Sequence, residues 1–137
     1  MEEVEILRGR AKTFLKYAKE ALEREDFDFA CFSSEQAAQL FVKSVILELV
    51  GEVPRLHRVR ELLHLLSRSV PEMEKPITEF VEENREALRA LDDAYITSRY
   101  MPSMYTREDA EALVRLAEDL IEFIGRVLRN AGIREVL

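Results

Sequence analysis

The stretch that decides the fold is DFACFSSEQAAQLFVKSVILELV, residues 28–50. It contains no proline or glycine, and its apolar side chains fall on more than one face of a helix. We predict one long helix that ends at Gly51, because glycine readily adopts the left-handed conformation that stops helices. A helix that is apolar on several sides is either central in a bundle or shared with a second subunit.

Amphipathic stretches on both sides of this helix predict an all-α protein. Apolar residues recur at three- and four-residue spacing over residues 3–24, over 56–68 and from Pro76 to Ser98. A last helix runs to about residue 130, with Thr106 as N-cap and Asp109 completing a capping box. Short connectors between such helices imply antiparallel neighbours.

Length and composition predict one domain over residues 1–137, large enough to bury a core without metals or disulfides. The single cysteine rules out an intrachain disulfide and suits a reducing compartment. No apolar leader segment or run of about 18 apolar residues is present, so we expect a cytoplasmic protein without a membrane anchor. The net charge of −7 argues against indiscriminate binding of polyanions.

Several chemistries are excluded by counting. Glu61 and His64 have the Glu-x-x-His spacing of di-iron bundles, but the only other histidine, His57, has Pro54 three residues before it. One cysteine and two histidines also make a structural zinc site improbable. No glycine-rich phosphate loop occurs. We therefore expect no metal and no cofactor.

The turn between the last two predicted helices is the first candidate site. Arg99 and Tyr100 lie at a helix end, with Tyr95 one turn earlier. A guanidinium there can bind phosphate through two hydrogen bonds, and a tyrosine can stack on a base. The alternative is structural, with Arg99 paired to Asp92, Asp93 or an acid of the last helix.

A basic cluster precedes the third predicted helix and consists of Arg55, His57, Arg58 and Arg60. The helix dipole disfavours cations at a helix start, so their presence raises the prospect of an anion site. The alternative is that these side chains are simply solvated.

Three polar residues of the central helix, Glu35, Gln39 and Lys43, are spaced four apart and can share one ridge. We expect this ridge to be a solvated edge supported by weak pairing.

Two blocks in register resemble the HEPN domain, a helical bundle of higher eukaryotes and prokaryotes described as nucleotide-binding. The first is FSSEQAAQLFVKSVILELVGEVPRLHRVRELLHLL, residues 32–66. The matching positions are Glu35, Gln36, Ala37, Ala38, Lys43, Gly51 and His57. The second is AYITSRYMP, residues 94–102, similar to the family's Arg-Tyr-Pro element except that Met101 intervenes.

The resemblance implies an up-and-down bundle of four long helices plus a short one, usually dimeric. It also implies a minimal nucleotidyltransferase as partner, in a two-component or toxin–antitoxin-like system. We expect a homodimer that buries the helix at residues 28–50 and the uncovered part of the last helix. The candidate residues for binding a nucleotide or short RNA are Arg99, Tyr100, Tyr95, His57, Arg58 and Lys43.

Some HEPN branches are metal-independent ribonucleases with an Arg-x(4–6)-His motif. Counted from Arg99, the histidine would fall at positions 104–106, which hold Met104, Tyr105 and Thr106. None of these supplies the general base of RNA cleavage near neutral pH, which indicates a non-nuclease branch. Arg58 and His64 fit the spacing formally but lie within one predicted helix. The alternative function is a ribonuclease that uses Arg99 with His57 or His64.

Overall fold

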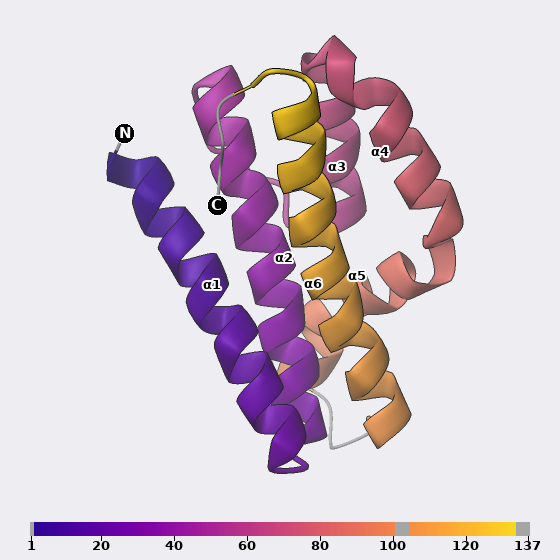
Figure 1. The fold of residues 1–137 in the computed structure, drawn as a ribbon. Coiled ribbons are helices and arrows are strands. Elements are labelled where there is room, and N and C mark those ends of the chain that lie inside the picture. Colours follow the sequence, from indigo (N-terminus) through magenta and orange to yellow (C-terminus); the bar gives the residue numbers. More distant parts are fainter. Residues whose placement is uncertain (1, 101–104, 134–137) are drawn as a thin grey trace.

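The computed structural model describes residues 2–100 and 105–133, apart from the side chain of residue 99. Within these residues every regular element is a helix, which confirms the all-α prediction (Figure 1). The helices are α1 (Glu2–Glu23), α2 (Phe27–Val50), α3 (Val59–Ser69), α4 (Pro71–Glu83), α5 (Arg85–Tyr100) and α6 (Arg107–Asn130). None of the helices in this part of the chain is long and apolar enough to cross a membrane.

Helix α2 is central in the bundle, which is one of the two arrangements that its apolar faces predict. It packs against α1, α3, α5 and α6, and most extensively against α1, with which it forms a long antiparallel hairpin (Figure 1). The predicted stop at Gly51 is confirmed, since Gly51 has a φ of 104° and its N–H donates to the Leu47 carbonyl at 3.0 Å. Helix α4 does not contact α2 and packs instead against α3, α5 and α6.

A single apolar cluster runs through the interior and takes side chains from all six helices. Its fully buried members include Ala18, Phe41, Leu62, Ile77, Leu91 and Leu120. Burying a large aliphatic or aromatic side chain contributes about 1.5–3 kcal/mol, so this cluster is the main source of stability.

The prediction of one helix from Pro76 to Ser98 is wrong. Pro71 begins α4 in its first turn, Pro76 lies inside α4, and the chain breaks at Asn84 before α5 starts. The backbone N–H and the side-chain Nδ2 of Asn84 both donate to the Phe80 carbonyl, at 3.0 and 2.9 Å. Asparagine side chains compete for backbone groups in this way and so favour helix ends. The chain therefore turns sharply here (Figure 1). Residues 2–100 and 105–133 form six helices, where the sequence predicts five.

The predicted start of the last helix is confirmed. Thr106 Oγ1 accepts from the Asp109 N–H at 3.1 Å, and Asp109 Oδ2 accepts from the Thr106 N–H at 2.9 Å. The start of α6 is also tied to the α1–α2 turn by an ion pair between Arg107 and Glu25.

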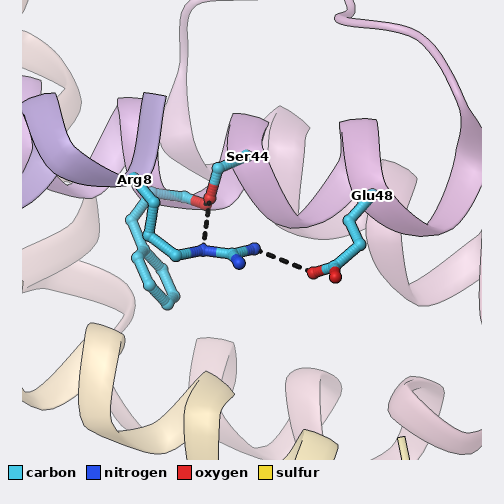
Figure 2. A network of polar contacts seen from close by, with 4 residues as sticks. Arg8, Ser44 and Glu48 are labelled. Carbon is cyan, nitrogen blue, oxygen red and sulfur yellow. Dashed lines mark hydrogen bonds and ion pairs between the residues drawn. The ribbon is translucent and has the colours of Figure 1, made fainter. Parts of the chain in front are cut away.

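An arginine holds the α1–α2 hairpin together at the other end of α2 (Figure 2). Arg8 donates from Nε to Ser44 Oγ at 3.3 Å and from Nη2 to Glu48 at 3.0 Å. Its guanidinium also lies over the Phe41 ring, 6.0 Å from the centroid. Because Arg8 and Glu48 are largely shielded from water, this pair is worth more than an exposed one.

Candidate functional site

The connector at residues 51–58 brings two sequence-predicted site residues together. His57 stacks on Tyr95 of α5, with ring centroids 5.3 Å apart and an interplanar angle of 11°. His57 is exposed and Tyr95 is half-buried. We call this region, formed by His57, Arg58 and Tyr95, the loop–α5 corner. It joins residues that are far apart in the sequence, which periodicity alone does not predict.

Helix α3 begins at Val59, so its predicted start at Leu56 is wrong by three residues. The reason is a carboxylate from α5. Asp92 is buried and accepts from the Val59 N–H at 2.5 Å and, more weakly, from the Arg60 N–H at 3.4 Å. A carboxylate at a helix N-terminus satisfies unpaired N–H groups and interacts favourably with the helix dipole.

Asp92 also binds one member of the basic cluster. The Nε of Arg60 donates to Asp92 Oδ2 at 2.7 Å. The basic cluster predicts an anion site. For Arg60, the anion is the protein's own Asp92. Arg55, His57 and Arg58 remain exposed, and they lie just before the first turn of α3.

The prediction of a solvated edge at Glu35, Gln39 and Lys43 is wrong, because all three side chains are buried. They form a ladder of hydrogen bonds along α2. Lys43 Nζ donates to Gln39 Oε1 at 3.0 Å, and Gln39 Nε2 donates to Glu35 Oε2 at 2.6 Å. Gln36 Nε2 donates to the other Glu35 oxygen at 2.7 Å. Lys43 is only 8% exposed, so its ammonium is directed into the ladder and not toward a surface ligand.

Burial changes the protonation of this ladder. It raises the pKa of Glu35 to about 7, while hydrogen bonds from Gln36 and Gln39 lower it and the nearby Asp92 raises it further. Burial also lowers the pKa of Lys43, against the attraction of Glu35. Asp92, which helps to raise the pKa of Glu35, is also the carboxylate that accepts from the Val59 N–H at the start of α3.

A groove of about 500 Å³ follows the outer side of α3 and shares Arg58 with the loop–α5 corner. We call it the α3 groove. It is lined by Leu56, Arg58, Arg60, Glu61, His64, Leu65 and Arg68. Guanidinium and imidazole groups around a partly apolar floor suit an anionic organic ligand.

The α3 groove is a surface that the sequence does not predict. Its signal is the four-residue spacing of Arg60, His64 and Arg68, which places all three on one ridge of a helix. The spacing alone does not tell whether this ridge is exposed, because that depends on which side of α3 is buried.

The remaining predicted site residues lie at the end of α5. Tyr100 is 68% exposed in the last turn of the helix. The backbone of Arg99 is helical and lies one turn beyond Tyr95, but the Arg99 side chain and residues 101–104 are outside the described residues.

Two other reactive groups are shielded. Burial raises the pKa of the Cys31 thiol to about 12, so this cysteine stays protonated. Burial likewise raises the pKa of Tyr105 to about 12, against a hydrogen bond with Thr97 that lowers it. No cluster of metal-ligating side chains occurs among residues 2–100 and 105–133.

Comparison with known proteins gives one family match. A family model described as the HEPN domain matches residues 4–127. No curated protein sequence matches the chain.

Two solved structures are similar over nearly the whole chain. The crystal structure of TT1696 from Thermus thermophilus is 28% identical, with a TM-score of 0.72, and the match covers 93% of this chain and 100% of that one. The crystal structure of ST0689, described as an archaeal HEPN homologue, is 26% identical with a TM-score of 0.60, covering 90% and 97%.

Proposed function

This chain belongs to the HEPN domain family, and on that premise we propose that it binds a nucleotide or a nucleotide-bearing partner at the loop–α5 corner. It does so without chemistry of its own. The observation that carries the proposal is the stack of His57 on Tyr95 directly beside Arg58. An exposed flat ring next to a guanidinium offers a base-stacking surface and a phosphate ligand within one short segment.

The predicted site residues divide into two groups on this proposal. His57, Arg58 and Tyr95 form the binding surface, and Tyr100, exposed in the last turn of α5, is a further candidate for contact with the ligand. Lys43 acts indirectly, because it stabilises the buried ladder of α2. Arg99 is proposed as a further phosphate ligand from its position one turn beyond Tyr95.

Calorimetric titration with nucleoside mono- and triphosphates tests the proposal. We expect Arg58→Ala to weaken binding about tenfold or more, since a hydrogen bond between charged groups contributes about 1.5–3 kcal/mol. His57→Ala removes the stacking ring and weakens binding as well. The matched control is Arg10→Ala, an exposed arginine of α1, which contacts neither α3 nor α5 in the described part of the chain. Absence of any nucleotide binding by the unmodified protein would refute this function.

We propose a minimal nucleotidyltransferase as the protein partner, in a two-component or toxin–antitoxin-like system. Family membership supports the pairing, and exposed apolar side chains at the end of α5 offer a contact surface: Ile96 is 58% exposed and is followed one turn later by Tyr100. Co-expression with a nucleotidyltransferase encoded beside this gene should give a complex that co-elutes. Ile96→Glu should separate the two proteins, whereas Ile6→Glu, on an exposed isoleucine of α1, should not.

We also propose a homodimer. Phe29 and Val50 are large apolar side chains left exposed on α2, the helix that the sequence assigns to a shared interface. Light scattering should give twice the chain mass, and Phe29→Glu should reduce it to the mass of one chain. A single-chain mass for the unmodified protein would remove this part of the proposal.

The alternative function, a metal-independent ribonuclease, has one observation in its favour. His57 packs onto α5 through Tyr95, one helical turn before Arg99. Incubation with RNA in the presence of a chelator decides between the ribonuclease and the non-catalytic binding function. Cleavage that disappears in His57→Ala or His64→Ala would establish the ribonuclease and overturn the non-catalytic proposal.

A further inference from the structure

We propose that the groove between α4 and α6 is a docking site for a short segment of another protein, which carries a basic residue at one end, an apolar residue in the middle and an acidic residue at the other end. We call it the α4–α6 groove, and it encloses about 520 Å³. None of its lining residues belongs to the α3 groove or to the loop–α5 corner, so this inference is independent of nucleotide binding.

The centre of the α4–α6 groove is aromatic. Helix α4 packs mainly on α3 and touches α6 only lightly, so the space between α4 and α6 is not filled by interlocking side chains. The Phe80 ring of α4 stacks on the Phe123 ring of α6, with centroids 4.5 Å apart and an interplanar angle of 16°. Both side chains are half-buried, so part of this aromatic pair stays in contact with water. An apolar side chain of a partner would cover it, and the burial of apolar surface drives most protein association.

The charged side chains of the groove are sorted by sign along its length. Helices α4 and α6 run in opposite directions past each other, and the aromatic pair fixes their register (Figure 1). Lys75 of α4 and Arg126 of α6 therefore lie toward one end of the groove. Glu83 of α4 and Asp119 of α6 lie toward the other end. A partner with opposite charges at its two ends matches this arrangement.

These charges are available to a partner. None of the six charged side chains that line the groove forms an ion pair or a side-chain hydrogen bond within residues 2–100 and 105–133. All six are exposed, and they are Lys75, Glu79, Glu83, Asp119, Glu122 and Arg126. Because four of the six are acids, the basic residue of the partner contributes most to charge complementarity.

Arginine fits the basic position of the partner better than lysine does. Its guanidinium can meet a carboxylate such as Glu83 or Asp119 through two hydrogen bonds. The same flat group can lie on a neighbouring phenyl ring, which attracts it by a cation–π interaction. Lysine offers a compact charge without the planar fork.

The length of the groove limits the length of the segment. The seven residues from Asp119 to Arg126 rise by about 10 Å along α6. An extended chain covers this distance in about three residues, at about 3.3 Å per residue. A helix covers it in about seven residues. The partner segment thus needs an arginine and an acidic residue at one of these two spacings, with an apolar residue between them.

Selection of random dodecapeptides displayed on phage, with the full chain immobilised, tests the inference. We expect the enriched peptides to share an arginine, an apolar residue and an acidic residue at one of the two spacings. The enriched peptides are then synthesised, and their binding to the protein in solution is measured by calorimetry.

Glu83→Lys is the decisive variant, because it reverses a charge at the acidic end on an exposed side chain. It should weaken peptide binding about tenfold, since an attraction is replaced by a repulsion. A peptide whose arginine is replaced by glutamate should lose binding to the unmodified protein and regain it with Glu83→Lys. Glu111→Lys, on an exposed acid of α6 outside the groove, is the matched control and should change neither.

The cationic end has its own test. Lys75→Glu should weaken the binding of the enriched peptides by a similar factor, and replacing their acidic residue by arginine should restore it. Lys16→Glu, on an exposed lysine of α1, is the control and should leave binding unchanged.

Three results of the selection would overturn the inference: no enriched peptide, enriched peptides without a basic residue, or equal binding to Glu83→Lys and the unmodified protein. A second copy of the chain is the other possible occupant. Light scattering that gives a lower mass for Glu83→Lys, but not for Glu111→Lys, would assign the groove to that copy and overturn the inference as well. Each of these results leaves the proposed nucleotide binding as it stands.

Discussion

The polar ladder of α2 and the cationic row of α3 have the same pattern in the sequence and opposite environments in the structure. Glu35, Gln39 and Lys43 are spaced by four residues, as are Arg60, His64 and Arg68. The first set is buried and hydrogen-bonded internally, whereas His64 and Arg68 are exposed and line a groove. Spacing decides which side chains share a helix face, and the neighbouring helices decide whether that face meets water.

Hydrogen bonds explain why the polar side chains of the α2 ladder can be buried. A buried polar group is costly unless it is hydrogen-bonded, and each member of the α2 ladder has such a partner. The side chains of Arg58, His64 and Arg68 have no ion-pair partner in the described part of the chain. Changes in the buried region should therefore alter stability, and changes on α3 should alter binding.

The largest expected effect is on stability and comes from Asp92→Ala. Removing this carboxylate leaves the Val59 N–H without its acceptor and the Arg60 guanidinium without its counter-charge. A hydrogen bond to a charged group contributes about 1.5–3 kcal/mol, and Asp92 accepts two short ones, so the expected loss is about 3–5 kcal/mol. Urea unfolding measures the loss. The neighbouring Asp93→Ala, on an exposed side chain, should change stability by less than about 0.5 kcal/mol, and equal losses in the two variants would contradict the role of Asp92.

The next effect concerns Glu35 and pH. Burial raises its folded-state pKa from 4.5 to about 7, so between these values the folded protein holds a proton that the unfolded chain has released. Stability should therefore fall as pH rises through this window, by up to about 3 kcal/mol. Glu35→Gln should remove that dependence and stabilise the protein at about pH 8.

Unfolding in urea at about pH 5 and about pH 8 measures this change. Glu111→Gln, on an exposed acid of α6, is the control and should leave the pH dependence as it is. A Glu35→Gln variant with the same pH profile as the unmodified protein would show that Glu35 does not titrate in this window.

A smaller effect is expected at Arg8, a cation that is paired internally like Arg60. Arg8→Ala removes the hydrogen bonds to Ser44 and Glu48 and should cost about 1–2 kcal/mol of the free energy of unfolding. Arg10→Ala, two residues away on an exposed face of α1, should cost less than about 0.5 kcal/mol. Thermal unfolding of the two variants side by side tests the difference. Equal melting temperatures would argue against a stabilising role for the Arg8 hydrogen bonds to Ser44 and Glu48.

The smallest effect on stability is expected on α3. Arg58→Ala and Arg68→Ala should each change the free energy of unfolding by less than about 0.5 kcal/mol, because both side chains are exposed. Their effect should appear in ligand binding instead. A large loss of stability in either variant would mean that the row is structural and would remove the contrast with the α2 ladder.

Features that depend on a few neighbouring residues could be predicted from the sequence. Gly51 stops α2, and Thr106 with Asp109 starts α6, because these contacts are made within one helix end. The break at Asn84 was missed, since the apolar spacing continues through it and only the side-chain bond to Phe80 marks the end of α4. The start of α3 was misplaced because its capping group, Asp92, lies 33 residues away in the sequence.

In the candidate site, too, the sequence predicts the residues, and the fold decides which of them meet. Residue types and spacing identified His57, Arg58 and Tyr95 as candidates, and a resemblance to a family strengthened them. Only the fold placed His57 on Tyr95, turned Lys43 inward and left Arg68 beside a groove.

The sequence by itself determined that the chain is helical, that α2 is apolar on more than one face, and where α2 ends and α6 begins. These properties arise from periodicity and local hydrogen bonds, which act over a few residues. The tertiary structure decided which charged face is buried and which is exposed. That depends on which helix covers which, and hence on packing between residues far apart in the chain. A carboxylate of α5 and an arginine of α3 share one hydrogen bond only because the bundle brings them together.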